Sequence, residues 1–205
     1  MFIVIEGIDG AGGNTQTNLL KKFLEEKNFE VELIKYPDYS NPIGKLINEF
    51  LNKKFDFSPE TQFGLYALDM VKDKEKILES LKRGKIVLAD RYIHSTLAYQ
   101  CMAKEFPLEK GLKFVEIFEL PKPDLVILLD IKAETSIRRK FKEKNELDRH
   151  ESDKEFLEKV RKGYLKLAEE KIFAKEWVVV DGEKSIEAVA GEIQKIVLSR
   201  LGEEA

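Results

Sequence analysis

The opening sixteen residues restrict the fold of this chain more than any other stretch. Residues 2–5 are apolar and mostly β-branched, glycines follow at positions 7, 10, 12 and 13, and a helical pattern begins at Leu19. Glycines between a strand and a helix let backbone N–H groups point inward, where they bind phosphate together with the positive end of the helix. The spacing Gly7-x-x-x-x-Gly12 is that of the phosphate loop Gly-x-x-x-x-Gly-Lys-Ser/Thr.

The last two positions of this motif differ from the pattern. Gly13 stands in place of the lysine, and Asn14 stands in place of the hydroxyl that binds magnesium. The backbone cradle is therefore retained, but its ammonium group is lost. Considered alone, a glycine-rich turn of this kind is also compatible with a simple structural turn.

Apolar runs alternate with helical patterns along the rest of the chain. We expect strands at 31–36, 85–89, 125–129 and 177–180, and helices at 43–51, 59–81, 95–103, 110–120, 133–142, 153–171 and 185–201. Uniformly apolar strands that alternate with helices predict an α/β fold, with a parallel sheet covered on both faces. With 205 residues and no linker or internal repeat, the chain is expected to form a single domain.

The composition excludes several classes of function. Lys and Arg number 35 against 38 Asp and Glu, so nucleic acid is not an expected partner. No segment approaches the roughly 20 apolar residues that span a bilayer, and we expect no membrane association. A single cysteine, Cys101, cannot form an intramolecular disulfide, and His94 and His150 have no metal-ligand spacing. These features, with a first apolar run too short for a secretory signal, favour the cytoplasm.

Polar residues follow the expected strands at their carboxyl ends, where ligands bind in parallel sheets. They include the glycine loop, residues 37–39, Asp90-Arg91, Asp130 and Asp181-Gly182. Beside a phosphate loop, Arg91 could bind a phosphate in a bidentate manner while Asp90 holds a metal ion or its waters. A surface ion pair is the alternative interpretation of Asp90 and Arg91.

Residues 138–152 are rich in charge and form a candidate lid. Phosphoryl transfer needs cations around the transferring group and the exclusion of water, which a basic lid would supply. The available donors are Arg138, Arg139, Lys142, Lys144 and Arg149. A solvated helix face and loop is an equal alternative.

Seven segments, in order and in spacing, resemble those of thymidylate kinases. They read IEGIDGAGxxTQ, YPDYSNPIGKL, LYALD, DRYIHSTLAYQ, LPKPDLVILLD, LDRHE with VRKGYLKLA, and DGEKSIEAV. The resemblance covers nearly the whole chain and implies a three-layer phosphate-loop fold whose sheet has the strand order 2-3-1-4-5. It also implies transfer of the γ-phosphoryl group of ATP to dTMP, giving dTDP and ADP, with Mg²⁺ as the metal and a homodimer as the assembly.

The resemblance also implies roles for individual residues. Asp9 would approach the sugar hydroxyl of the acceptor, Arg91 its phosphate, and Tyr66 would stack on thymine. The implied dTMP site comprises Asp9, Pro37, Tyr39, Tyr66, Met70, Arg91, Ser95, Tyr99 and Gln100, with Tyr99 placed against a ribose 2′-hydroxyl. The implied ATP site comprises Gly7, Ile8, Asp9, Gly10, Ala11, Gly12, Gly13, Asn14, Thr15, Gln16, Asp181 and Gly182. The catalytic candidates are Asp9, Asp90, Arg91, Arg138, Arg139, Lys142 and Arg149, and the metal-binding candidates are Asn14 and Asp90.

Four positions bear on the activity and on the substrate. Gly10 stands where some members have an arginine, which implies the subtype whose lid supplies the catalytic cation. Outside the glycine loop, Met70 stands where a thymine-contacting arginine is expected. Tyr39 stands where some members have an arginine that binds phosphate. Three functions therefore remain open: an impaired dTMP kinase, a kinase for another nucleoside monophosphate, and a non-catalytic nucleotide-binding relative. A lid lysine is one candidate to replace the cation missing at Gly13.

Overall fold

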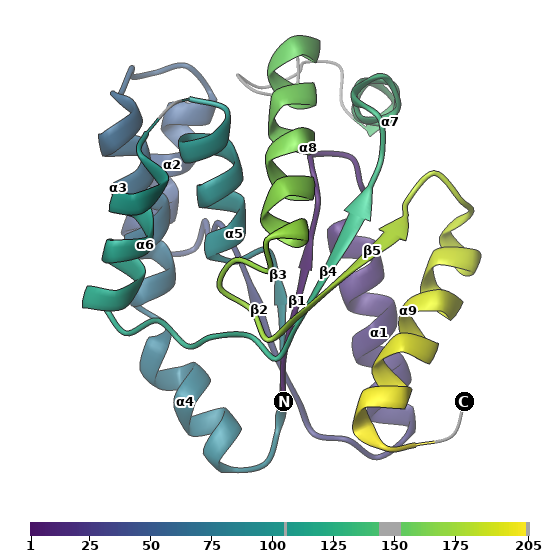
Figure 1. Ribbon diagram of the computed structural model, residues 1–205. Helices are drawn as coiled ribbons and strands as arrows, with labels where there is room; N and C mark the ends of the chain where they lie inside the picture. The colour runs from purple at the N-terminus through teal and green to yellow at the C-terminus, as the bar shows by residue number, and fades with distance from the viewer. Residues whose placement is uncertain (105, 144–152, 204–205) are drawn as a thin grey trace.

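The computed structural model describes residues 1–104, 106–143 and 153–203 (Figure 1). Within these ranges five strands form one parallel sheet: β1 (Phe2–Glu6), β2 (Val31–Lys35), β3 (Ile86–Asp90), β4 (Leu125–Asp130) and β5 (Glu176–Asp181). Their order in the sheet is β2-β3-β1-β4-β5, which confirms the expected topology. The central strands β1 and β3 are buried along their whole length, as apolar strands of a parallel sheet must be when helices cover both faces.

Helices lie on both sides of this sheet (Figure 1). They are α1 (Gly13–Glu26), α2 (Pro42–Leu51), α3 (Pro59–Val71), α4 (Lys74–Lys82), α5 (Ile93–Thr96), α6 (Leu108–Ile117), α7 (Ala133–Glu143), α8 (Lys154–Glu169) and α9 (Ile186–Leu201). Helices α1 and α9 pack against each other on one side, while α8 lies beside α5 on the other. The result is the expected three-layer arrangement of helices, sheet and helices.

The expectation of one helix over residues 59–81 is wrong. Two helices, α3 and α4, occupy this stretch, and the chain turns between them at Lys72 and Asp73. The ammonium of Lys72 lies 3.4 Å from Asp69 and 3.3 Å from Asp38, which belongs to the loop after β2. A contact with a distant loop therefore fixes the turn, and the local apolar pattern contains no trace of it.

Three other helices start two or more residues earlier than expected, and one of them is α6, which begins at Leu108 and ends at Ile117 where 110–120 was expected. Helix α1 begins at Gly13 and not near Leu19, because Gly12 adopts a φ of 96° and turns the loop directly into the helix. The helix expected at 95–103 begins with α5 at Ile93 and continues as a π-helical turn over Leu97–Met102. The start of α3 is as expected, since the Ser58 hydroxyl accepts a hydrogen bond from the Thr61 N–H.

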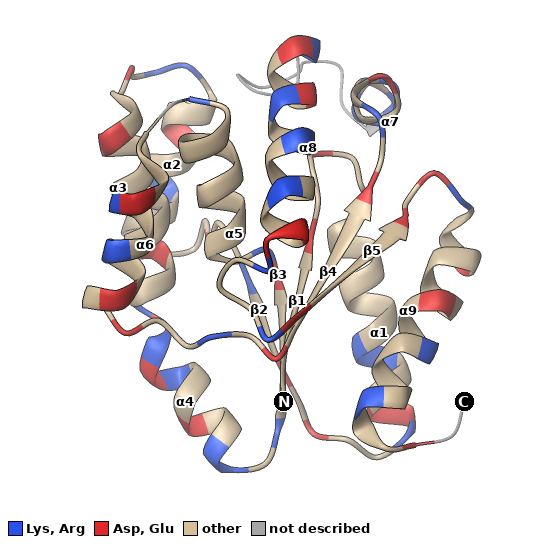
Figure 2. Cartoon of the chain, in the orientation of Figure 1, with Lys and Arg blue, Asp and Glu red and all other residues tan. Residues whose placement is uncertain are grey.

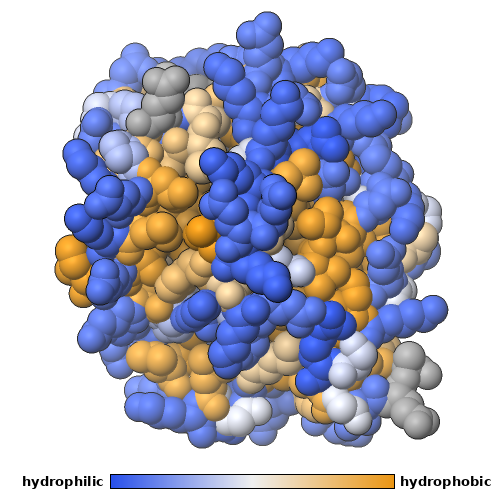
Figure 3. All heavy atoms as spheres, viewed as in Figure 1, coloured by the Kyte–Doolittle hydropathy of each residue, from blue (hydrophilic) through white to orange (hydrophobic). Residues whose placement is uncertain are grey.

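The surface fits the balanced composition. The face seen in Figure 3 is largely hydrophilic, with apolar areas between charged side chains. Across the described ranges, no helix combines the length and the hydropathy needed to cross a bilayer.

Candidate active site

The glycine loop between β1 and α1 forms the floor of a polar cavity of about 500 Å³. Gly10 adopts a φ of 77°, and a Cβ atom there would lie 2.9 Å from the Ser136 carbonyl oxygen of α7. The loop is closed by a 3.0 Å hydrogen bond from the Ala11 N–H to the Ile8 carbonyl. Strand, tight turn and helix N-terminus are thus arranged as a phosphate cradle requires.

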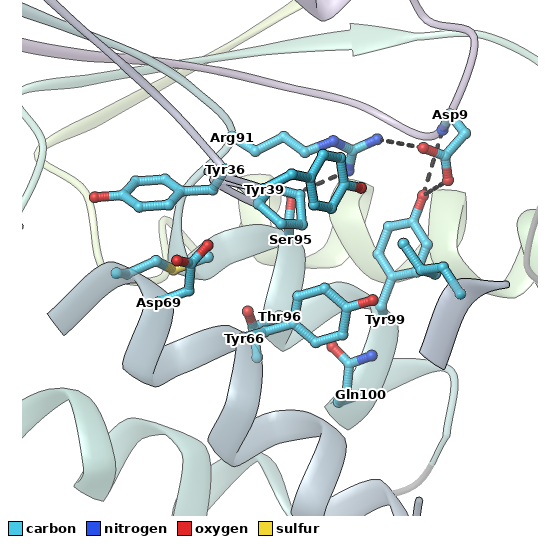
Figure 4. Close-up of a pocket in the computed structure, with 13 residues that line it drawn as sticks. Asp9, Tyr36, Tyr39, Tyr66, Asp69, Arg91, Ser95, Thr96, Tyr99 and Gln100 are labelled. Carbon is cyan, nitrogen blue, oxygen red and sulfur yellow. Dashed lines mark hydrogen bonds and ion pairs between the residues drawn. The ribbon is translucent and has the colours of Figure 1, made fainter. Parts of the chain in front are cut away.

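Arg91 follows β3 and turns toward the loop (Figure 4). Its Nη2 donates to Asp9 Oδ1 at 2.8 Å, and its Nη1 donates to the Ser95 hydroxyl at 3.1 Å. The Tyr99 hydroxyl donates to the other oxygen of Asp9 at 2.6 Å. Burial, reinforced by the Asp9 carboxylate, raises the pKa of Tyr99 well above its ordinary value. The phenol therefore stays protonated and remains a donor to Asp9.

A second, less polar pocket adjoins the cavity on the side of α3 and α5. It is lined by Asp9, Tyr36, Pro37, Tyr39, Leu51, Tyr66, Asp69, Met70, Arg91, Ser95, Thr96, Tyr99 and Gln100. All nine residues expected to surround dTMP are among them. The rings of Tyr39, Tyr66 and Tyr99 enter the pocket from three different segments (Figure 4). Flat apolar faces next to an arginine suit a molecule that has both an aromatic ring and a phosphate.

The residues expected to bind ATP divide into two groups. The polar cavity is lined by Gly7, Ile8, Asp9, Gly10, Ala11, Gly12, Gly13, Asn14 and Thr15, together with Lys35, Asp90 and Lys140. Gln16 is outside this lining, because it is buried and donates to the Ile186 carbonyl of α9 at 3.0 Å. Asp181 ends β5, Gly182 follows it, and neither residue lines the cavity.

The sequence of α7 places its cations in different environments. Arg139 donates to the Gly10 carbonyl at 3.1 Å and to the Gly182 carbonyl at 2.9 Å, so it ties the glycine loop to the end of β5. Arg138 contacts the Thr135 hydroxyl, and Lys142 is exposed. The remainder of the expected lid, including Lys144 and Arg149, lies outside the described residues, so its role stays a prediction.

Two oxygen donors expected to bind metal stand at the cavity wall. Burial raises the pKa of the Asp90 carboxyl, although Arg91 and Lys35 oppose this shift. The Asn14 side-chain oxygen accepts a 3.0 Å hydrogen bond from Lys35 Nζ. Among the described residues no group of three or more His, Cys, Asp or Glu could hold a metal ion. One or two protein oxygens beside phosphates and waters are nevertheless the usual ligands of Mg²⁺, and Asp90 and Asn14 fit this pattern.

Acidic residues also end β4 and β5, at the same edge of the sheet as the glycine loop (Figure 2). Asp130 of β4 receives Arg161 of α8 in a bidentate pair, with distances of 2.6 and 2.8 Å. The pair holds α8 against the sheet. Asp130 therefore stabilises the edge and does not enter the cavity.

Comparison with known proteins identifies the family. The model of the family described as thymidylate kinase matches residues 5–193. The chain belongs to this family. The probable thymidylate kinase of Pyrococcus abyssi is 39% identical over 98% of this chain and 97% of its own length. That of Thermococcus kodakarensis is 36% identical over the full length of both chains, and the thymidylate kinase of Thermoanaerobacter sp. is 36% identical over 96% of each.

Several residues that line the two pockets of this thymidylate kinase family member escaped the sequence analysis, among them Asp69, Lys140 and the three described next. Glu6 is buried at the end of β1 and accepts hydrogen bonds from the Tyr92 N–H at 2.8 Å and the Ser95 hydroxyl at 2.7 Å. Thr96 lines the aromatic pocket, and its buried hydroxyl has no hydrogen-bond partner among the described residues. Lys35 reaches the glycine loop. Glu6 and Lys35 are charged residues that end the mostly apolar strands β1 and β2, and this pattern in the sequence could have indicated them.

Proposed function

We propose that this chain transfers the γ-phosphoryl group of ATP to dTMP, giving dTDP and ADP. The observation that carries the proposal is that two pockets of different character meet at one ion pair. Asp9 and Arg91 line both the polar cavity over the glycine loop and the aromatic pocket beside α3. A phosphate donor in the first and a nucleoside monophosphate in the second would therefore have their phosphates next to each other, as an in-line transfer needs.

The reaction needs alignment and charge neutralisation more than it needs a base. The second pKa of a phosphate monoester is near 6, so the attacking oxygen of the acceptor is already ionised at neutral pH. That oxygen forms a new bond to the γ-phosphorus, while the bond from the γ-phosphorus to the β,γ-bridging oxygen breaks and leaves its electron pair on ADP. Arg91 would hold the acceptor phosphate, and the backbone N–H groups of the loop would hold the donor phosphates.

The aromatic pocket would select the nucleoside. Tyr66 would stack on the base, Ser95 and Gln100 would line the base and sugar, and Asp9 would accept a hydrogen bond from the sugar hydroxyl. Tyr99 is fixed by its bond to Asp9, so its ring would stay against the side of the sugar that carries a ribose 2′-hydroxyl. Mg²⁺, held by Asp90 and Asn14 together with the phosphates, would neutralise charge on ATP.

The assembly and the location belong to the same proposal. A homodimer is supported by the resemblance stated above and by apolar side chains left exposed on α3 and α6, namely Leu68 at 40% and Ile117 at 75% exposure. Sedimentation of the purified chain at two concentrations tests it. The cytoplasm is supported by the balanced charge and the single cysteine.

The test is turnover with each nucleoside monophosphate in the presence of ATP and Mg²⁺, measured as ADP release and as formation of the diphosphate. We expect dTMP to be the preferred acceptor, and Arg91→Met to abolish its use. Preference for another monophosphate would overturn the assignment of dTMP, and Met70, buried beside the base pocket, would be the first residue to examine. Calorimetric binding of dTMP and ATP without any turnover would show a non-catalytic relative.

A further inference from the structure

The glycine loop lacks its lysine, and a different lysine stands beside it. Lys35 is the last residue of β2, and it pairs in register with Asp90, the last residue of β3. Its Nζ lies 3.0 Å from the Asn14 side-chain oxygen and 3.8 Å from Asp90 Oδ2. Lys35 also lines the polar cavity over the loop. An ammonium group is therefore present at the phosphate cradle, and it comes from a neighbouring strand.

The position of Asp90 relates this ammonium to the missing one. A Cβ atom built at Gly13 would lie 2.9 Å from Asp90 Oδ1. The Asp90 carboxylate thus leans over the point where a lysine at position 13 would begin, and Lys35 approaches its other oxygen. A lysine at position 13 would consequently start beside the same carboxylate that Lys35 approaches.

We infer that Lys35 supplies the phosphate-binding ammonium that Gly13 lacks. This inference rests on the proposed function. In the transfer, Lys35 would leave Asn14 for the donor phosphates and neutralise charge that gathers on the β,γ-bridging oxygen as its bond to the γ-phosphorus breaks. Its side chain is 56% exposed, so its contacts with Asn14 and Asp90 are weak and can be exchanged at small cost.

The other described cations near the cavity are arranged differently. Arg91 is paired with Asp9 on the acceptor side, and both ends of the Arg139 guanidinium are occupied by backbone carbonyls. Lys140 of α7 lines the same cavity and is the competing candidate. It comes from the helix that leads into the expected lid, whereas Lys35 is anchored at the end of a sheet strand. Lys35 is favoured because its ammonium lies 3.0 Å from Asn14, the residue directly after Gly13.

The experiment compares Lys35→Met with Lys22→Met, which removes a lysine from the exposed face of α1, and with Lys140→Met. Methionine keeps most of the aliphatic stem and removes the charge. We expect Lys35→Met to lower kcat for dTMP about a hundredfold, within the range for loss of one donor at a developing charge. We expect Lys22→Met to leave it unchanged, and Lys35→Arg to retain part of it. A large loss in Lys140→Met with none in Lys35→Met would overturn the inference.

A rescue separates direct phosphate binding from mere support of Asp90. Gly13→Lys should change kcat little in the wild-type background but restore at least about tenfold in the Lys35→Met background, because the two ammonium groups would serve the same phosphates. Failure of the rescue, in a variant whose melting temperature matches that of Lys35→Met, would assign Lys35 a supporting role and refute the inference.

Binding of inorganic tripolyphosphate separates this inference from the proposed function. Calorimetry should show weaker binding to Lys35→Met than to the wild type and to Lys22→Met, and the difference should shrink with added salt. If the wild type fails to phosphorylate any monophosphate, the proposed function falls while this measurement still decides the role of Lys35. Equal tripolyphosphate affinity in all three proteins would refute the inference even if turnover is normal.

Discussion

The backbone of Arg91 is strained, and a pair of substitutions can measure how much this strain lowers the free energy of unfolding. Its φ is 69°, in the left-handed region, which costs a residue with a Cβ atom about 1–2 kcal/mol. Arg91→Ala and Arg91→Gly both remove the guanidinium and its bonds to Asp9 and Ser95. They differ only in the Cβ atom, so their difference in stability isolates the backbone term.

The expected sign follows from two opposing effects. Glycine avoids the left-handed penalty of about 1–2 kcal/mol, but it gives the unfolded chain extra entropy worth about 0.4–1 kcal/mol. Arg91→Gly should therefore be more stable than Arg91→Ala by about 1 kcal/mol, or about 2–4 °C in melting temperature for a chain of this length. Urea unfolding of both variants gives the free energies, and neither should phosphorylate dTMP.

A matched pair on an ordinary helix provides the control. Glu79 lies in the exposed part of α4, with its side chain 66% exposed. There Glu79→Gly should be less stable than Glu79→Ala by about 1 kcal/mol, the reverse order. The strain argument is refuted if Arg91→Gly is no more stable than Arg91→Ala while the Glu79 pair behaves as expected.

Three further perturbations test other parts of the site. Tyr99→Phe removes a 2.6 Å hydrogen bond to the Asp9 carboxylate and should cost about 1.5–3 kcal/mol in unfolding free energy, measured with urea. Gly10→Ala places a Cβ atom 2.9 Å from the Ser136 carbonyl oxygen, at a φ of 77°. It should lower the free energy of unfolding by about 1–3 kcal/mol and weaken ATP binding in calorimetry. An unchanged stability together with an unchanged ATP affinity would contradict the close approach. Burial raises the pKa of the Asp90 carboxyl in the folded state above its unfolded value of 3.8. Between the unfolded and the folded pKa, the folded state binds more protons than the unfolded state, so the free energy of unfolding falls as pH rises through that window. Asp90→Asn should remove this fall, which urea midpoints from pH 4 to about 7 will show.

The fold was largely predictable from sequence, because buried parallel strands need apolar runs and these runs are visible without any partner. The strand expected at 85–89 is found at Ile86–Asp90, for example. The prediction of one helix over 59–81 was wrong because the break between α3 and α4 involves a long-range contact. Lys72 reaches Asp38, which is more than thirty positions away in the sequence. Local periodicity holds no information about such a contact.

The candidate site shows the same division. Residues directly after strands could be assigned to one edge, because the carboxyl ends of parallel strands meet there. Asp9, Arg91 and the tyrosines do lie together. Lys35 was missed because the strand expected at 31–36 placed it inside a strand, whereas β2 ends at Lys35 and its register with β3 brings this residue beside Asp90. Thr96 was missed because a hydroxyl one residue after Ser95 reads as ordinary helix sequence.

The loss of the loop lysine changes the charge balance that a nucleotide meets. Glu6, Asp9 and Asp90 all border the cavity, and a triphosphate would add further negative charge beside them. Asp9 is balanced by Arg91, but Asp90 is buried, and burial disfavours its charged form. Its ion-pair partner is Lys35, whose Nζ lies 3.8 Å away. Bound phosphate would attract Lys35 away from Asp90, which then needs another cation or a proton. Without a loop lysine, ATP binding therefore depends on the metal ion that accompanies the nucleotide and on Lys35 of β2. A lysine introduced at position 13 should make binding independent of Lys35, while the need for the metal ion remains.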